Sequence, residues 1–337
     1  VVDFSAVSPL NACGGVPVVL DGNPQGGSGT YTQHRWTGDI GPLSSYVIQT
    51  PDFLSVIPGE FNLNYRVTDS NGCSGNGDIK VIVDSPSAQF SQDITFGCTP
   101  LQVAFTKDMT GFIRWEWNFG DGSPVDQVSV NPVHTFVSTQ PGSIEFFEVK
   151  LRVETAEGCT DEYSSFITVY PAVDASFAPD ATVICSGDIV TFNASPGAGR
   201  YFWDYGDGVS GYSTHAATHL YTNFTPDPLP ITVRLTTTSF FNCTDTKTYN
   251  ITVMPVPVPQ FTADPVLQVF TPPGSQVTFT NQTNAGNWTW LWKFGDKTTS
   301  NEMNPVHTYN DVGTYYVTLI AGNQYCSDSI MHYINIV

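Results

Sequence analysis

The chain has 337 residues, a formal net charge of −19 and a sequence pI near 4.3. A surface this acidic argues against nucleic-acid binding, which needs a basic face for the phosphates, and no segment reaches the run of about 18 apolar residues that a membrane-spanning helix requires. Plentiful Gly, Pro, Thr, Val and aromatic residues suit short strands and turns better than helices. We therefore expect an all-β protein.

The first part of the chain contains two strand-like stretches that flank a long, irregular middle. Tyr31–Trp36 reads YTQHRW, and Tyr65–Cys73 reads YRVTDSNGC and is followed by a strand that runs to Val83. Alternating apolar and polar residues predict strands here. The frame of this part resembles the later parts of the chain, but its middle does not.

The later parts of the chain repeat one pattern with a period of about 85 residues. Trp115–Gly122 reads WEWNFGDG, Phe202–Gly208 reads FWDYGDG and Trp290–Lys297 reads WLWKFGDK. A Val-x-Phe strand precedes each of these segments, NPVHTF, ATHLY or NPVHTY follows, and each repeat closes with two alternating strands. Several short strands with turns between them predict a two-sheet, immunoglobulin-like β-sandwich.

Proline clusters after the last strand of each repeat mark the boundaries. They divide the chain into four modules, which we call module 1 (1–84), module 2 (85–171), module 3 (172–256) and module 4 (257–337). Short linkers that contain Pro are stiff, so the tandem modules are expected to form an elongated rod.

The aromatic residues of the repeat fall on one face of their strand, where they would fill the space between two sheets. A carbohydrate-binding stripe is the less favoured alternative. The Asp that follows Gly in the tight turn would accept backbone N–H groups, and the recurring His would be a packed, hydrogen-bonded residue. These predicted structural residues are Trp117, Asp121, His134, Trp203, Asp207, His219, Trp292, Asp296 and His307.

The strand-turn W-x-F/Y-G-D-G followed by N-P-x-H-T-F/Y resembles the signature of polycystic kidney disease (PKD) domains. It is nearly complete in modules 2 and 4 and partial in module 3. Module 1 is more similar to repeats of large Bacteroidota surface adhesins, including gliding-motility adhesins, through Gly26, Gly27, Gly29, Tyr31, Trp36 and Val67–Cys73. The resemblance implies an extracellular, repetitive and non-catalytic protein and does not identify a ligand.

The sequence contains no nucleophile elbow, zinc-protease motif or phosphate-binding glycine loop. We therefore expect no enzyme but a structural or adhesive array, part of a secreted cell-surface adhesin or filament. The alternative is an accessory array beside the catalytic domain of a secreted hydrolase that degrades glycans or proteins. The expected partners are neighbouring modules of the same longer chain, surface glycans or proteins, or further copies of the chain.

Calcium is the one cofactor that the sequence suggests, because some PKD-like domains bind it between modules. The candidate ligands, close to predicted junctions or turns, are Asp84, Asp174, Asp180 and Asp264. Calcium needs six to eight oxygen ligands, and the sequence offers only scattered single acids.

The seven cysteines occupy two recurring positions and indicate an oxidising compartment. The first position, before the Val-x-Phe strand, is held by Cys13, Cys98 and Cys185. The second, after the penultimate strand, is held by Cys73, Cys159, Cys243 and Cys326. In module 4, Pro272 takes the place of the first-position cysteine.

Two pairing schemes account for an odd number of cysteines. Pairing within modules gives Cys13–Cys73, Cys98–Cys159 and Cys185–Cys243 and leaves Cys326 free. Staggered pairing between successive modules gives Cys13–Cys159, Cys98–Cys243 and Cys185–Cys326 and leaves Cys73 for a preceding module. The staggered scheme is favoured, because the two positions of one sandwich should lie more than about 20 Å apart, whereas a disulfide needs Cα atoms within about 7 Å.

Overall fold

The computed structural model describes residues 2–4 and 8–337, and this part of the chain consists of strands and turns without an α-helix. It accordingly holds no helix that is long and apolar enough to cross a membrane. The chain separates into two compact units, Val1–Pro171 and Ala172–Val337. This division coincides with the predicted boundary between modules 2 and 3.

Buried hydrophobic residues form four clusters, and each cluster lies inside one predicted module. A fully buried tryptophan stands in each, namely Trp36, Trp117, Trp203 and Trp292. The all-β, immunoglobulin-like class predicted from the sequence is confirmed, while the finer module limits remain a prediction.

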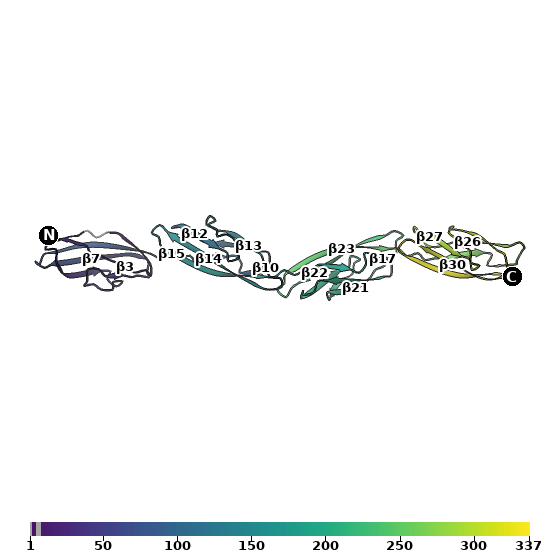
Figure 1. Ribbon diagram of the computed structural model, residues 1–337, viewed down its shortest axis with the longest axis horizontal. Helices are drawn as coiled ribbons and strands as arrows, with labels where there is room; N and C mark the ends of the chain where they lie inside the picture. Colours follow the sequence, from purple (N-terminus) through teal and green to yellow (C-terminus); the bar gives the residue numbers. More distant parts are fainter. Residues whose placement is uncertain (1, 5–7) are drawn as a thin grey trace. The chain divides into compact units, whose positions relative to one another are not determined.

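Module 2 contains a four-stranded sheet in the order β10-β15-β14-β12 and a three-stranded sheet in the order β13-β11-β9. Figure 1 shows β14 beside β15, the long antiparallel pair that closes the module. The strands are β9 (Ser91–Gln92), β10 (Phe96–Cys98), β11 (Leu101–Thr106), β12 (Phe112–Asn118), β13 (Val133–Phe136), β14 (Glu145–Thr155) and β15 (Thr160–Tyr170).

Modules 3 and 4 share this topology and add one edge strand to the larger sheet. The orders are β17-β23-β22-β19-β20 with β16-β18-β21, and β25-β31-β30-β27-β28 with β24-β26-β29. The strands of module 3 are β16 (Phe177–Pro179), β17 (Val183–Cys185), β18 (Ile189–Ala194), β19 (Arg200–Asp204), β20 (Ser210–Ser213), β21 (Ala216–Leu220), β22 (Leu229–Thr238) and β23 (Thr244–Met254). Those of module 4 are β24 (Phe261–Asp264), β25 (Leu267–Gln268), β26 (Ser275–Asn281), β27 (Thr289–Lys293), β28 (Thr299–Ser300), β29 (Val306–Tyr309), β30 (Gly313–Gly322) and β31 (Ser327–Ile336).

Module 1 keeps the larger sheet, in the order β2-β8-β7-β5, but its described residues otherwise form only the short pairs β3-β6 and β1-β4. This is the divergence that its irregular middle suggested. The strands are β1 (Val2–Phe4), β2 (Leu10–Cys13), β3 (Val18–Val19), β4 (Pro24–Gly26), β5 (Tyr31–Gly38), β6 (Asp52–Phe53), β7 (Gly59–Asp69) and β8 (Ser74–Asp84).

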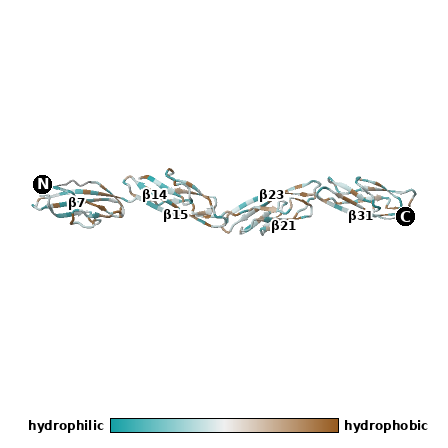
Figure 2. Cartoon of the chain, viewed as in Figure 1, coloured by the Kyte–Doolittle hydropathy of each residue, from teal (hydrophilic) through white to brown (hydrophobic). Residues whose placement is uncertain are grey.

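The long strands alternate between core and solvent, as their sequences predict. In β14, Val149, Leu151 and Val153 are fully buried, whereas the residues between them are partly or well exposed. Figure 2 shows the resulting alternation of hydrophobic and hydrophilic residues along β14 and β23. Because successive side chains of a strand point to opposite faces, this pattern settles which face of the sheet packs against the second sheet.

One glycine in each repeat has a conformation and a position that only glycine tolerates. Gly120 has φ 74° and Gly206 has φ 80°, and a Cβ at either residue would stand 2.4 Å from a backbone oxygen of the neighbouring strand. Gly295 repeats the arrangement with φ 91° and a Cβ position 2.8 Å from the Tyr316 nitrogen. The left-handed backbone and the close approach together explain why the aromatic strand always runs into Gly-Asp.

This glycine gives a prediction with a control from the same turn. Gly120→Ala should destabilise the chain by at least about 3 kcal/mol, because it adds a backbone clash to an unfavourable φ. Gly122 also has a positive φ, of 83°, but open space around its Cβ position, so Gly122→Ala should cost only about 1 kcal/mol. Chemical denaturation of the full chain measures both, and equal costs would contradict the close approach.

Candidate functional site

The two last strands of each larger sheet separate the two cysteine positions. In module 1, β8 is 11 residues long, so its ends lie about 33 Å apart. Cys13 pairs with Asp84 at the end of β8, where the linker begins, whereas Cys73 precedes the first residue of β8. We call these two ends of a module the linker end and the turn end.

A recurring turn holds the second-position cysteine at the turn end. Its carbonyl accepts a hydrogen bond from the N–H of Asp69, Thr155, Ser239 or Asn323 at the end of the penultimate strand, at 2.8–2.9 Å. In modules 1, 3 and 4 the side chain of that same residue accepts the N–H of the cysteine, at 2.8, 3.1 and 2.9 Å. Four different polar residues thus place a cysteine at the same point of the fold.

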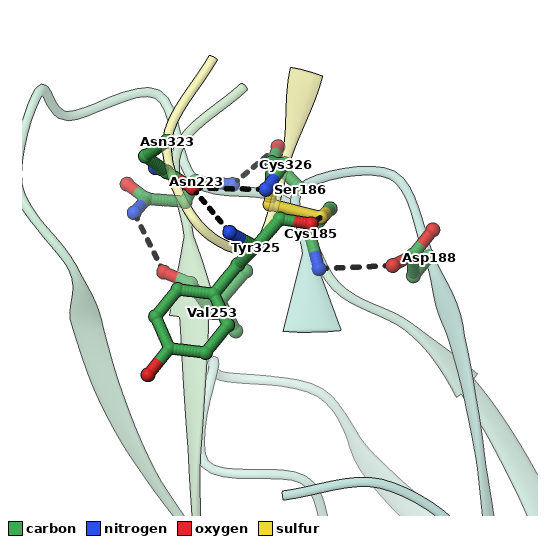
Figure 3. The surroundings of a disulfide bond; sticks show 8 residues. All are labelled: Cys185, Ser186, Asp188, Asn223, Val253, Asn323, Tyr325 and Cys326. Atoms are coloured by element: carbon green, nitrogen blue, oxygen red, sulfur yellow. Dashed lines mark hydrogen bonds between the residues drawn. A yellow bond between two sulfur atoms is a disulfide. The ribbon is translucent and has the colours of Figure 1, made fainter. Parts of the chain in front are cut away.

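The structure contains the disulfides Cys13–Cys159 and Cys185–Cys326, with Cα atoms 5.4 and 5.8 Å apart. Each joins the linker end of one module to the turn end of the next. Around the second bond, shown in Figure 3, the Cys185 N–H donates to Asp188 at 2.9 Å and the Cys326 N–H to Asn323 at 2.9 Å. Cys326 is 3 % exposed and Cys159 1 %, so the bonds are sheltered on the turn side.

These are the staggered pairs, and pairing within modules is wrong for the cysteines concerned. The reason is the length of the last strand, which holds the two positions of one module at opposite ends. Cys98 and Cys243 are also disulfide-bonded, and their pairing with each other stays a prediction. Cys73 is a free, exposed thiol, so its bond to a preceding module stays a prediction too.

The position equivalent to the first cysteine in module 4 is Val269, not Pro272. In modules 1 and 3, the residue after the cysteine donates its N–H to the last residue of β8 or β23, at 2.7 and 2.9 Å. In module 4 this donor is Phe270, which bonds Val337 at 2.7 Å. Counting back from the Val-x-Phe strand misplaced the site, because the connection from β25 to β26 is longer than its counterparts.

The Asp and His of each repeat form a pair that the sequence analysis did not connect. The His Nε2 lies 2.7 Å from an Asp carboxylate oxygen in His134–Asp121, His219–Asp207 and His307–Asp296. Each imidazole also stacks on the aromatic residue before the Gly-Asp turn, with ring centres 3.9–4.1 Å apart. The recurring spacing of Asp and His, 11 to 13 residues, was the signal that could have revealed the pair.

Hydrogen bonds stabilise the charged form of these carboxylates. Partial burial by itself would raise the pKa of Asp296, but bonds from Thr298 and His307 outweigh it, so the pKa lies below its ordinary value. The pKa values of Asp121 and Asp207 are lowered in the same way, with His134 and His219 as donors. The other carboxylate oxygen accepts a turn N–H at 3.0 Å in all three. These contacts fit the structural role expected for Asp and His.

The described residues include no group of three or more His, Cys, Asp or Glu that could hold a metal ion. Asp174 accepts hydrogen bonds from Ser176 and Ser195, and Asp180 from the Thr191 N–H. Asp84 lines an open groove of about 720 Å³ with Asp108 and Glu157, and Asp264 lies within β24. Calcium binding stays a prediction.

Comparison with known proteins identifies two of the modules. The family model of the PKD domain matches residues 84–171 and 255–333. These two segments are PKD domains. They correspond to modules 2 and 4, where the aromatic strand, the Gly-Asp turn and the stacked His stand together; no curated protein matches the chain as a relative. Module 3 has the sheet topology of module 4 and the same Asp–His pair as both PKD domains.

Solved structures of other tandem domains resemble the chain distantly. The D1–D4 ectodomain fragment of ICAM-5 is 10% identical, with a TM-score of 0.41, over 100% of this chain and 99% of that one. An Antarctic bacterium's Ca²⁺-stabilized adhesin that binds ice is 10% identical, with a TM-score of 0.31, over 98% and 99%. The extracellular domain of protocadherin GammaB4 is 14% identical, with a TM-score of 0.30, over 99% and 66%. Likenesses this low say nothing about what this chain binds.

The lowered carboxyl pKa values predict a loss of stability in acid. A group with a depressed pKa stabilises the fold above its unfolded value of about 3.9, and this contribution is lost as the pH falls through the folded value. Asp296→Asn should therefore lower stability by about 1–2 kcal/mol at pH 7, and this deficit should shrink as the pH falls through the lowered folded pKa of Asp296. Glu302→Gln, an exposed carboxyl of the same module, serves as the control.

Melting temperatures of the full chain between pH 2 and 8 measure this difference. A deficit of the Asp296→Asn variant that stays constant over the whole range would show that charge plays no part in the pair.

Peptide mapping without reduction should recover the staggered pairs. Digestion after alkylation is expected to give Cys13 linked to Cys159 and Cys185 linked to Cys326, with Cys73 alkylated, because these four sulfur atoms are bonded in pairs and the Cys73 thiol is free. Mass spectrometry identifies the linked peptides. A peptide joining Cys185 to Cys243 would contradict the register of β17 beside β23.

Proposed function

We propose that this chain is a non-catalytic segment of a larger adhesin or filament on a cell surface, in which sandwich modules supply reach and disulfides secure the junctions. The observation that carries the proposal is the bond between one module's linker end and the next module's turn end, present at Cys13–Cys159 and Cys185–Cys326. A bond inside a module would stabilise that module alone. A bond between modules instead secures the junction between them.

The disulfides also support an extracellular location. Six of the seven cysteines are oxidised, a state that persists in secreted proteins and is rare in the reducing cytosol. The acidic surface suits a soluble, exported array. The PKD domains in modules 2 and 4 supply the same sandwich scaffold twice.

The polar residues of the repeat are committed to the fold, which supports a non-catalytic role. One oxygen of each Asp carboxylate accepts a turn N–H and the other bonds the His, and each His ring stacks on an aromatic ring. The partners that we propose are neighbouring modules of a longer chain and, at the surface, glycans, proteins or further copies.

Two measurements on the protein from its native source test the proposal. Antibodies against this chain should label intact cells, and external protease should remove the signal, because the array is placed outside the cell. Thiol titration in denaturant should find at most one reactive thiol per chain, that of Cys73.

The competing hypothesis, that the chain is an accessory array of a hydrolase, predicts catalytic activity in the full-length protein. The full-length protein would then cleave a glycan or peptide, and the activity would separate from this chain on proteolysis. Labelling only after cell lysis, together with seven reactive thiols, would overturn the surface location itself.

A further inference from the structure

We propose a mechanical function for the staggered disulfides: under tension they divert the load past the folded sandwiches and into single strands at the centre of their sheets. The inference goes beyond reach and adhesion, since it concerns which part of the chain bears force. It rests on chain connectivity and on sheet order.

Each disulfide closes a long covalent loop. Cys13 and Cys159 are 146 residues apart in sequence, and Cys185 and Cys326 are 141 apart. A pull on the two ends of the chain therefore reaches Cys13, crosses the sulfur atoms to Cys159, follows the backbone to Cys185 and crosses again to Cys326. Residues 14–158 and 186–325 stay outside this path, so their unfolding adds nothing to the end-to-end distance while the bonds hold.

The path enters the last strand of a sandwich at its turn end. After Cys159 it runs along β15, and after Cys326 along β31, and both strands are extended already. An extended strand has little length left to yield, because its rise of about 3.3 Å per residue is near the maximum of about 3.6 Å. In each pair of modules joined by a disulfide, the part of the path that runs along the last strand of the second module is thus nearly inextensible.

Two of the strands that carry the tension, β15 and β31, are held from both sides. β15 lies between β10 and β14, and β31 lies between β25 and β30. β15 pairs with β14 over ten residue positions from Glu145↔Val169 to Glu154↔Thr160 and with β10 over three. Because each of these strands is pulled at both of its ends, the tension runs through its backbone, and the hydrogen bonds on both sides keep it extended without being sheared; the edge strands β12 and β28 stay outside the path.

Each first-position cysteine completes the arrangement from the edge of its sheet. β2 and β17 are the edge strands that end in Cys13 and Cys185, parallel to β8 and β23. The parallel pairing brings the cysteine beside the last residue of its module, so the disulfide and the peptide linker leave the same end of the sandwich. The junction thereby has two covalent connections to the next module.

Force spectroscopy on the full chain, held at both ends, tests the proposal. With intact disulfides the path of residues 1–13, 159–185 and 326–337 should straighten to about 180 Å, whereas the reduced chain should reach about 1,200 Å. The variant with both Cys185→Ser and Cys326→Ser should gain about 420 Å without reductant, because the expected Cys98–Cys243 bond still shortens the path to residues 1–13, 98–159 and 243–337. Cys73→Ser is the matched control and should change nothing, because its thiol is free.

The outcomes that would overturn the proposal are distinct. Stepwise extension of the oxidised chain by about 280 Å per module would mean that the sandwiches bear the load, and a limit of about 560 Å would mean bonds within modules. These measurements need only the purified chain, so failure here leaves the surface location untouched, and failure of the surface location leaves this result standing.

Discussion

The pairing of two strands of 10 or 11 residues at the end of each module is the constraint on which the rest depends. Such a hairpin sets the length of the sandwich and therefore keeps its turn end and linker end about 33 Å apart. A residue that bonds the next module therefore has to stand at the linker end, and a residue that bonds the previous module at the turn end. The two cysteine positions lie at these two ends, so they are too far apart to form a disulfide within one module.

The second constraint is local and repeats three times. Glycine with positive φ lets the chain leave the aromatic strand against the neighbouring backbone, the following Asp closes the turn, and His anchors the turn to the second sheet through its hydrogen bond to the Asp and its stacked ring. Tyr221 and Tyr309 extend the link, because their hydroxyls donate to the carbonyls of Tyr205 and Phe294 at 3.0 and 3.1 Å. Module 1 has the equivalent glycine, Gly38, with φ 92° and a Cβ position 2.3 Å from the Asn62 backbone oxygen, but its described residues show no such Asp–His pair, and its second sheet is reduced to short pairs.

The sequence predicted the sandwich class, the buried tryptophans and the staggered bonds, because the alternation of apolar and polar residues and the repetition of motifs and cysteine positions are visible in the sequence itself. It did not predict the Asp–His pair, since the two residues lie on opposite sides of a turn and only the closing of the sheets brings them together. The cysteine-equivalent position of module 4 was assigned to Pro272 instead of Val269 for a related reason. Register is fixed by hydrogen bonds such as Phe270 to Val337, and a longer connection before β26 shifts the count without changing the register.

A linker with proline and a disulfide restrict a junction in different ways. Proline narrows the backbone angles of the linker but leaves one covalent connection, about which the next module can still turn. A disulfide adds a second covalent connection at a separate point, and this second connection limits how far the next module can turn about the linker. The Ala88 N–H adds a non-covalent contact in unit 1, since it donates to Asp161 on β15 at 2.7 Å, and Ala175 does the same with Asp245 on β23 at 3.0 Å. The linkers that enter modules 2 and 3 are thus fastened to the last strand of the module that they enter, and in module 2 this is the strand that the disulfide places under tension.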